Sequence, residues 1–319
     1  MNDAVLCFSV TPAWQRILLF DGFACGEVNR AKEVYSCAAG KGVNTARGLL
    51  QLGFHATTTG FNGGTTGRWL AEDIARIQMG NALIDVPFDT RICTTLIDRS
   101  QHTVTEMVEE TQQPDSAAIE SLIQRAHAQI ESSIALACCG TLPTWMPHTI
   151  YADLIAHAAQ RGIPTLVDSH KQPFLSALHA QPLLAKLNVQ ELALTTQTVI
   201  TDEASLLAAL RTLQSATPSA LLVTQGASAA YLAHANTIWR FTLPQLKSVV
   251  NPIGSGDSVN AGILAALLRN HALVRAVAYG LACGTANVQT RYPAQFEIDR
   301  VANYFTAIEH ACERISCIH

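Results

Sequence analysis

Short apolar runs alternate with longer segments of helical periodicity along most of the chain. Ala4–Val10 is a mostly apolar run that predicts a buried strand, and Gly42–Gly53 predicts a helix with one apolar face. Further strands are predicted at His55–Gly60, Ile134–Cys138, Pro164–Val167 and Ala220–Val223, and further helices at Arg68–Arg76 and Val259–Leu268. Because alternating strands and helices form βαβ units, we expect a parallel sheet covered by helices on both faces.

Two regions, each with a pair of predicted strands, break this alternation. Arg16–Phe20 and Val28–Tyr35 have the pattern of strands with no helix between them. Arg91–Asp98 and Thr103–Glu109 flank a polar turn, as in a hairpin. We therefore expect a small second sheet that forms a lid over a site at the carboxyl ends of the parallel strands.

The low charge of the chain excludes one class of partner. Only 14% of the 319 residues are charged, and the formal net charge is -4, whereas a nucleic-acid-binding protein needs a basic face to match the phosphates. No apolar run approaches the roughly 18 residues that span a bilayer, so no membrane partner is expected. The first ten residues lack the basic start and the cleavage site of a signal peptide.

The nine cysteines indicate a reducing environment. Their number is odd, Cys138 and Cys139 are adjacent, and no Cys-x-x-Cys pair occurs. This pattern argues against a disulfide framework or a zinc site, and it predicts free thiols in a cytoplasmic protein.

The strongest local motif is the stretch VVNPIGSGDS at residues 249–258, directly before the predicted helix Val259–Leu268. Its glycines let the backbone turn tightly, and the free N–H groups at a helix start bind anions. Asp257 within this motif has two interpretations. It is either a helix cap or a general base that takes a proton from a hydroxyl during phosphoryl transfer, and the motif alone leaves both open.

A second glycine motif, AAGKGVN at residues 38–44, begins another predicted helix. It lacks the spacing and the Gly-Lys-Ser/Thr ending of a P-loop. Lys41 between its glycines is either a ligand for a phosphate or carboxylate of the substrate or an exposed loop lysine. The chain has only five lysines, which adds weight to the first interpretation.

Two further motifs carry polar side chains. The stretch KLNVQE at residues 186–191 places Asn188 and Glu191 on one side of a helical turn. This pair is either an N-terminal helix cap or a set of groups that orient the waters of Mg²⁺. Thr224 and Gly226 follow the predicted strand Ala220–Val223 in a turn, which is a weak signal by itself.

In chain order, the motifs Gly-Lys-Gly-x-Asn, Asn-x-x-Glu, Thr-x-Gly and Gly-x-Gly-Asp resemble those of the ribokinase-like carbohydrate kinases of the PfkB type. The similarity is strongest to tagatose-6-phosphate kinase and 1-phosphofructokinase, and it spans essentially the whole chain. It implies a three-layer α/β/α fold with a mainly parallel central sheet and a small β-sheet lid. It also implies one domain over residues 1–319, with lid strands drawn from about 11–37 and 88–110.

The resemblance implies phosphoryl transfer from ATP with Mg²⁺ as the cofactor. Asp257 would be the catalytic base, beside an anion hole formed by the backbone N–H groups of Gly254, Ser255, Gly256 and Asp257 itself. The residues implied on the nucleotide side are Lys186 at the ATP phosphates, Thr224 and Gly226 beside the nucleotide, Asn287 near the adenine, and Asn188 and Glu191 around Mg²⁺ through water.

On the acceptor side, the resemblance implies a phosphorylated sugar. Lys41 and Arg91 would hold the phosphate already on the acceptor, since a guanidinium binds phosphate in a bidentate manner. The other substrate-binding residues that it implies are Gln15, Gly40, Asn44 and Thr141. Because both ligands are phosphorylated, we expect a strongly positive site.

The acceptor side also departs from the family pattern. Gln15 stands where the family has an Asp that binds sugar hydroxyls, Cys93 replaces an Asn, and Ala39 replaces a glycine. A glutamine forms hydrogen bonds but carries no charge. We therefore expect an altered acceptor specificity with phosphoryl transfer intact.

The leading hypothesis is a homodimer, formed through the lid, that phosphorylates a ketohexose phosphate to a bisphosphate. The acceptors considered are tagatose 6-phosphate, fructose 1-phosphate and fructose 6-phosphate. One alternative is a kinase for an unphosphorylated sugar or a nucleoside. Another is a noncatalytic homologue that binds a sugar phosphate or a nucleotide.

Overall fold

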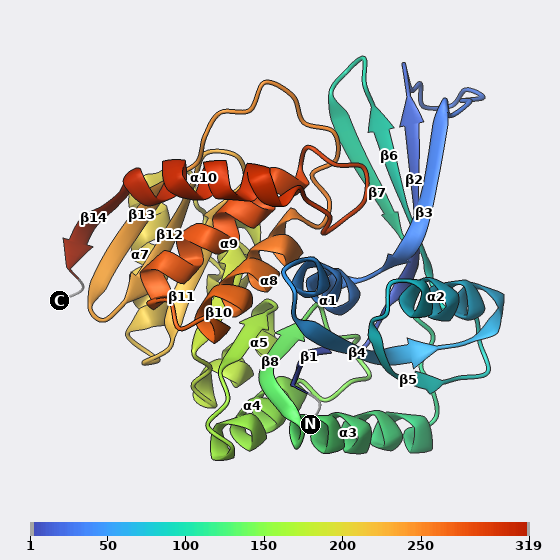
Figure 1. The fold of residues 1–319 in the computed structure, drawn as a ribbon, viewed down its shortest axis with the longest axis horizontal. Coiled ribbons are helices and arrows are strands. Elements are labelled where there is room, and N and C mark those ends of the chain that lie inside the picture. The colour runs from blue at the N-terminus through green and yellow to red at the C-terminus, as the bar shows by residue number, and fades with distance from the viewer. Residues whose placement is uncertain (1–2, 318–319) are drawn as a thin grey trace.

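The computed structural model describes residues 3–317, which form two sheets and ten helices (Figure 1). The larger sheet has ten strands in these residues. In spatial order they are β14 (Cys312–Cys317), β13 (Thr237–Thr242), β12 (Ala229–His234), β11 (Ala220–Gln225), β10 (Leu184–Asn188), β9 (Thr165–Asp168), β8 (Ser133–Cys139), β1 (Ala4–Phe8), β4 (His55–Asn62) and β5 (Gly80–Asp85). The strands from β11 to β5 pair in parallel, and β12, β13 and β14 add antiparallel pairs at one edge.

The smaller sheet stands apart from the larger one and forms the lid (Figure 1). In spatial order its strands are β3 (Glu33–Ala39), β2 (Ala13–Phe20), β6 (Ile92–Asp98) and β7 (Thr103–Val108). Strands β2 and β6 pair in parallel, and both outer strands are antiparallel to their neighbours. The prediction of a separate small sheet is thus confirmed.

The predicted lid strand Val28–Tyr35 is wrong in its bounds. Pairing with β2 begins only where Glu33 lies opposite Leu19. Before that point, the Asn29 amide donates hydrogen bonds to the backbone oxygens of Ala24 and Glu27 at 2.7 and 3.0 Å, respectively. These bonds hold the segment in a turn, so the strand starts five residues later than predicted.

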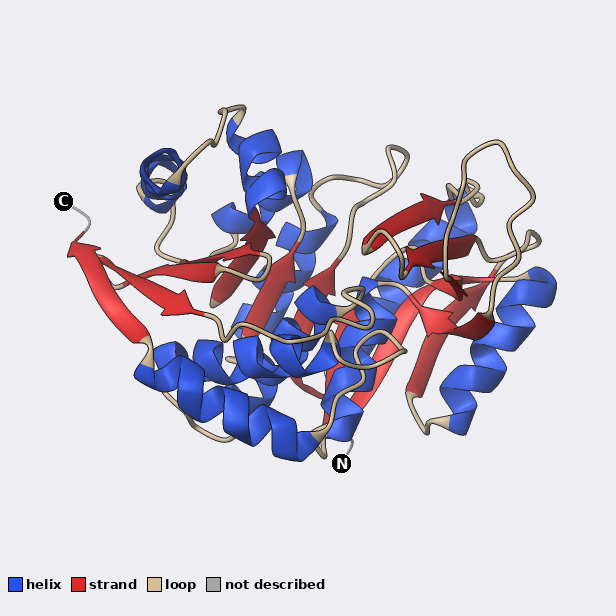
Figure 2. Cartoon of the chain, turned by 90° about the horizontal axis from the view of Figure 1, so that it is seen from above, coloured by secondary structure: helices blue, strands red, loops and turns tan. Residues whose placement is uncertain are grey.

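Helices cover both faces of the larger sheet, which gives three layers (Figure 2). One face carries α1 (Lys41–Gln51), α2 (Gly64–Arg76), α8 (Ser255–Leu268), α9 (Leu273–Asn287) and α10 (Ile298–His310). The other face carries α3 (Ser116–Ile130), α4 (Ile150–Gln160), α5 (Lys171–His179), α6 (Val189–Thr196) and α7 (Glu203–Gln214).

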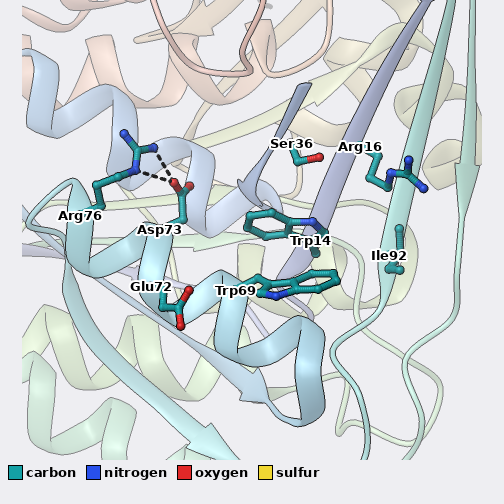
Figure 3. A pocket seen from close by; sticks show the side chains of 8 residues that line it. All are labelled: Trp14, Arg16, Ser36, Trp69, Glu72, Asp73, Arg76 and Ile92. Carbon is teal, nitrogen blue, oxygen red and sulfur yellow. Dashed lines mark hydrogen bonds and ion pairs between the residues drawn. The ribbon is translucent and has the colours of Figure 1, made fainter. Parts of the chain in front are cut away.

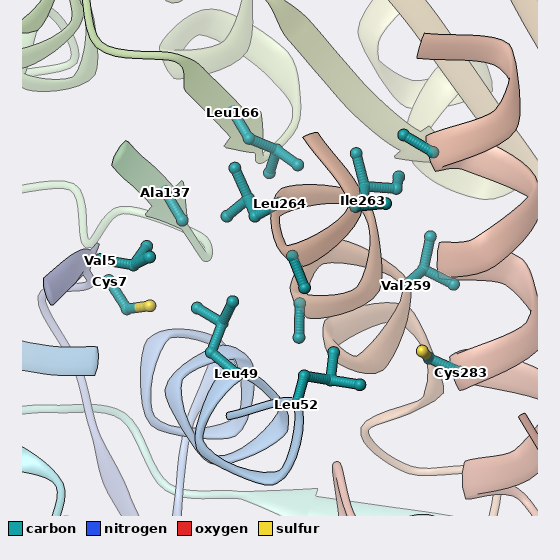
Figure 4. Packing of buried hydrophobic residues seen from close by; sticks show 14 of the residues in the cluster. Val5, Cys7, Leu49, Leu52, Ala137, Leu166, Val259, Ile263, Leu264 and Cys283 are labelled. Atoms are coloured by element: carbon teal, nitrogen blue, oxygen red, sulfur yellow. The ribbon is translucent and has the colours of Figure 1, made fainter. Parts of the chain in front are cut away.

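The two core clusters follow from the alternation of side chains along each strand. In β1, Val5 and Cys7 belong to one cluster, and Leu6 and Phe8 belong to the other. Successive side chains of a strand point to opposite faces, so a strand covered on both faces is apolar throughout. Figure 4 shows the first cluster, in which the β1 side chains lie beside Leu49 of α1.

Two expectations from composition can be compared with the described residues. No helix among them is long and apolar enough to cross a bilayer. The eight cysteines whose side chains are described are all free thiols.

Candidate active site

A cleft of about 970 Å³ lies between the lid and the carboxyl ends of the parallel strands. The floor of the cleft is formed by residues at or near the carboxyl ends of five parallel strands: Ser9 follows β1, Gly140 follows β8, Asp168 ends β9, Asn188 ends β10, and Thr224 lies near the end of β11. The edge of the sheet predicted to carry the site is therefore the edge that the cleft occupies.

The cleft brings together all but one of the residues predicted for the site. Those that line it are Gln15, Gly40, Lys41, Asn44, Arg91, Thr141, Lys186, Asn188, Glu191, Thr224, Gly226, Gly254, Ser255, Gly256 and Asp257. The exception is Asn287, whose buried amide donates to the backbone oxygens of Tyr292 at 3.2 Å and Gln295 at 3.0 Å. Asn287 thus holds the loop after α9 and does not itself line the cleft, although its neighbour Val288 does. Its expected position near the adenine stays a prediction.

The N-terminus of α8 forms one wall of the cleft. This helix begins at Ser255, four residues earlier than predicted, after Gly254 adopts a φ of 80°. A Cβ atom on Gly254 would lie 2.6 Å from the Cβ of Pro293, so only glycine fits there. The Ser255 N–H donates to the Pro252 backbone oxygen at 3.3 Å, so it is not free as the predicted anion hole required. Within the described part of the chain, the N–H groups of Gly254, Gly256 and Asp257 have no backbone acceptor, which leaves them available to an anion.

Asp257 lies in the first turn of α8 and does not cap it. The N-cap is Gly254, and no side chain caps the helix, so the interpretation of Asp257 as a helix cap is wrong. Its buried carboxylate accepts a hydrogen bond from Asn44 Nδ2 at 2.8 Å. Burial and the charge of Asp168 raise the pKa of Asp257 to about 6, although Lys41 acts in the opposite direction. A carboxylate with a raised pKa is suited to accept a proton from a hydroxyl.

Asp168 is the centre of a charged network beneath the cleft, and the sequence analysis missed it. Its Oδ1 pairs with Lys41 Nζ at 2.8 Å. Its Oδ2 pairs with Lys186 Nζ at 2.7 Å and accepts a hydrogen bond from Asn260 Nδ2 at 2.7 Å. Burial favours a higher pKa for Asp168, but the two lysines outweigh burial and hold the pKa below its usual value. A signal for it existed, since Asp168 directly follows the predicted strand Pro164–Val167.

Lys41 is fixed by two carboxylates. Besides Asp168, its Nζ pairs with Glu191 Oε1 at 3.2 Å, and its side chain is 33% exposed. Burial favours a lower pKa for Lys41, but the neighbouring carboxylates raise it above its usual value. The interpretation of Lys41 as an exposed loop lysine is therefore wrong.

Lys186 connects this network to the N-terminus of α8. Its side chain is only 4% exposed. Its Nζ would lie 3.5 Å from a Cβ atom placed on Gly256. A fixed ammonium group beside free backbone N–H groups creates a local site for anionic phosphate oxygens.

Asn188 and Glu191 form a capping box at the start of α6. Asn188 Oδ1 accepts from the backbone N–H of Glu191, and Glu191 Oε2 accepts from that of Asn188, both at 2.8 Å. The capping interpretation is confirmed, and both residues also line the cleft. No group of three His, Cys, Asp or Glu side chains that could hold a metal ion occurs among residues 3–317. The pair therefore fits Mg²⁺ only through water, which this cation retains readily.

The lid supplies one end of the cleft, the end that the sequence analysis expects to bind the acceptor. Gln15 donates from Nε2 to Thr95 Oγ1 at 2.7 Å, which leaves its carbonyl oxygen for a ligand. The Arg91 guanidinium donates to the backbone oxygens of Thr11 at 2.9 Å and Glu109 at 3.4 Å. Its buried Nε has no partner in the described structure.

The cleft is not strongly positive, and this corrects the expectation from the sequence. The basic residues that line it are Lys41, Arg91 and Lys186, and the acidic ones are Glu106, Glu110, Asp168, Glu191 and Asp257. The motifs showed the lysines, Glu191 and Asp257, but they did not show Asp168, Glu106 and Glu110, which the fold also brings to the cleft. An anion bound in this cleft would therefore rely more on directed N–H groups than on net charge.

Comparison with known proteins decides the family. The profile described as pfkB family carbohydrate kinase matches residues 13–299. The chain belongs to this family. It is a carbohydrate kinase, which transfers a phosphoryl group to an alcohol group of its acceptor, and membership implies ATP as the donor.

Solved structures agree over nearly the whole chain. A provisionally named phosphofructokinase from Staphylococcus aureus is 25% identical, covers 98% of this chain and 99% of its own, and has a TM-score of 0.77. Phosphofructokinase-2 from Escherichia coli in complex with fructose 6-phosphate is 20% identical, with coverages of 97% and 100% and a TM-score of 0.84. A provisionally named 1-phosphofructokinase from Thermotoga maritima is 18% identical, with coverages of 98% and 100% and a TM-score of 0.87. The three-layer fold with its separate lid is thus the ribokinase-like fold.

Proposed function

We propose that this kinase phosphorylates a ketohexose phosphate to a bisphosphate. The observation that carries the proposal is the placement of Asp257, a buried carboxylate with a raised pKa in a helix turn whose N–H groups face the cleft. Similar solved structures support the acceptor class, since they include phosphofructokinase-2 in complex with fructose 6-phosphate.

The chemistry follows from the positions of the residues. Asp257 takes the proton from the acceptor hydroxyl as the hydroxyl oxygen attacks the γ-phosphorus and the bond to the leaving ADP oxygen breaks. The N–H groups of Gly256 and Asp257 face the transferring phosphoryl group and stabilise its charge. Lys186 balances the charge on the same side. When bound through water at Asn188 and Glu191, Mg²⁺ would neutralise part of the phosphate charge.

The acceptor end supports a phosphorylated sugar through Arg91. Its guanidinium lies at the cleft wall, and its Nε lacks a partner in the described structure. Lys41, which lines the same cleft, is the second proposed contact for this phosphate. Gln15 offers a carbonyl oxygen to a sugar hydroxyl in place of the carboxylate found in the family.

A second candidate is a kinase for an unphosphorylated sugar, and one observation favours it. Glu106 and Glu110 line the same cleft as Arg91. Carboxylates accept hydrogen bonds from sugar hydroxyls and repel a phosphate when they are charged. Burial raises the pKa of Glu106, which weakens that repulsion.

Rates of ATP consumption with a panel of acceptors separate these functions. The proposal expects turnover with tagatose 6-phosphate, fructose 1-phosphate or fructose 6-phosphate that exceeds turnover with the free sugars. Arg91→Gln should raise KM for the phosphosugar at least about tenfold, because a charge-assisted contact is lost, and leave KM for ATP unchanged. The matched control is Arg68→Gln, because Arg68 is exposed and its side chain bonds only to Thr65 in the described structure. Faster turnover of a free sugar would favour the second candidate.

We also propose a homodimer formed through the lid face that points away from the cleft. Leu18, Val34, Leu96 and Met107 share this face. Val34 and Met107 are each 51% exposed, and apolar strand faces of this kind favour association. Sedimentation should show a dimer for the wild type and a monomer for the double variant Val34→Lys, Met107→Lys. A wild-type monomer at micromolar concentration would contradict the lid interface.

A further inference from the structure

A second cleft, of about 650 Å³, lies on the face of the lid opposite the candidate active site (Figure 3). It is lined by Trp14, Arg16, Ser36 and Ile92 of the lid segments and by Trp69, Glu72, Asp73 and Arg76 of α2. Side chains alternate along β2, so Gln15 faces the active-site cleft while its neighbours Trp14 and Arg16 face the second cleft. A volume of this size is typical of small-molecule sites.

Two indoles form an aromatic wall in this cleft. The ring centroids of Trp14 and Trp69 are 5.8 Å apart, and the ring planes are inclined at 53° (Figure 3). Trp69 remains 44% exposed. An inclined pair leaves ring surface uncovered, and a planar ligand can stack on such a surface.

Two guanidinium groups and two carboxylates line this cleft, and one of the guanidinium groups is unpaired in the described structure. Arg16 is exposed, and its side chain makes no hydrogen bond or ion pair in the described part of the chain. Asp73 is shared between Arg76 and the buried Arg47, so its charge is more than balanced. Glu72 is the one other acidic residue in the described lining. Arg16 shares its lid face with Val34 and Met107 of the proposed dimer interface. Within one subunit, an anionic group can pair with Arg16 without displacing an existing contact.

We propose that this cleft binds a small molecule with a planar aromatic ring and an anionic group. A nucleoside monophosphate and an aromatic carboxylate both have this chemistry. The ring stacks on Trp69, and the anion pairs with Arg16. Because one wall belongs to the lid and the other to α2, the bound molecule joins the lid to the body of the enzyme. Its binding thereby changes the KM for the acceptor, which the lid helps to hold.

Tryptophan fluorescence can test this site directly. In the double variant Trp145→Phe, Trp239→Phe, the tryptophan fluorescence comes only from Trp14 and Trp69. Titration with AMP and with indole-3-carboxylate should give saturable quenching by at least one of them, while adenosine and inorganic phosphate bind at least about tenfold more weakly.

Arg16→Gln should raise the dissociation constant about tenfold, since a charge-assisted contact is lost. Arg68→Gln, on the same helix as Trp69 but outside the lining, should leave it unchanged. The responding probe identifies the ligand class.

Three results would overturn the proposal. The first is an absence of saturable quenching by either anionic ring at millimolar concentration. The second is an unchanged dissociation constant in Arg16→Gln. The third is that iodide quenches Trp69 in the variant Val34→Lys, Met107→Lys but not in the wild type, because a second copy of the chain would then occupy the cleft. None of these results depends on which sugar the enzyme phosphorylates.

Discussion

Asp257 is buried in an environment that disfavours its charge, yet its proposed role as a base requires that charge. Asp257→Asn keeps the shape and can keep the contact with Asn44, but it cannot take up the proton. We expect turnover to fall at least about 100-fold with little change in KM for ATP. Initial-rate kinetics check this, and near-wild-type turnover would remove Asp257 from the mechanism.

The same substitution should stabilise the protein. Since the folded pKa of Asp257 is about 6, above the usual value for an aspartate, the ionised form costs stability above that pH. The neutral asparagine avoids this cost. Thermal unfolding at pH 8 should therefore show a higher midpoint for Asp257→Asn than for the wild type, and a lower midpoint would mean that the burial argument is wrong.

The pH dependence of the free enzyme follows from the same group. The base must be ionised, so kcat/KM should fall below about pH 6, by about tenfold per pH unit once the group is mostly protonated. A profile measured with saturating Mg-ATP and limiting acceptor tests this. If kcat/KM stays flat well below pH 6, another group must take the proton.

Asp168 forms ion pairs with Lys41 and Lys186, and neither lysine pairs with another carboxylate that is as deeply buried. Asp168→Asn leaves Lys186 buried without its charged partner, so we expect a loss of about 3–5 kcal/mol in the free energy of unfolding. Urea denaturation at pH 7 measures the loss. Glu131→Gln is the control, because Glu131 is exposed and its pairs with His157 and Arg161 lie at the surface. Equal stability of the two variants would contradict the role given to Asp168.

At the residue scale, the ion pairs of this network are the part of the site that could not be predicted from the sequence. The glycine motifs identified Lys41 and Asp257 because local backbone chemistry requires those glycines. The pairing of Lys41 with Asp168 joins residues 127 positions apart. No periodicity or spacing reports such a contact, because it depends on which strands become neighbours in the sheet.

At the scale of the elements, the start of α8 depends on one glycine. Gly254→Ala places a Cβ atom against Pro293 and Ala294 and forces a residue with a φ of 80° to carry a side chain. We expect a cost of about 1–2 kcal/mol from the backbone conformation alone and turnover at least about tenfold lower, since the N–H groups move.

Gly53 provides the matched control for that substitution. Its φ is 83°, but a Cβ atom there would meet nothing within 4 Å. Gly53→Ala should therefore show a similar backbone cost with unchanged turnover. Chemical denaturation and initial rates separate the two effects. If both variants lose activity equally, the contribution of Gly254 to the anion site is refuted.

The strands show which elements can be predicted from local pattern. The buried parallel strands, such as Ala4–Phe8, were predicted because both faces are apolar. The lid strand Glu33–Ala39 was misplaced, because its start depends on pairing with Leu19. The antiparallel edge of β12, β13 and β14 was not predicted at all, and its last strand pairs residues about 75 positions apart along the chain.

At the scale of the molecule, the fold brings opposite charges together that the sequence presents separately. Acidic residues outnumber basic ones in the lining of the cleft, five to three, so net charge does not recruit anionic ligands. In the proposed mechanism, recognition then depends on the N-terminus of α8, on Lys186 and on Arg91. This explains why the family motifs indicated the reaction class but left the identity of the acceptor sugar open.

The most direct test of the central claim is phosphorus NMR of the reaction products. The account predicts that the wild type with Mg-ATP converts a ketohexose monophosphate into a species with two phosphomonoester signals, with matching formation of ADP. Asp257→Asn should give neither at a comparable rate. Formation of ADP with no second phosphomonoester signal on the sugar, or the same product from Asp257→Asn at the wild-type rate, would contradict it.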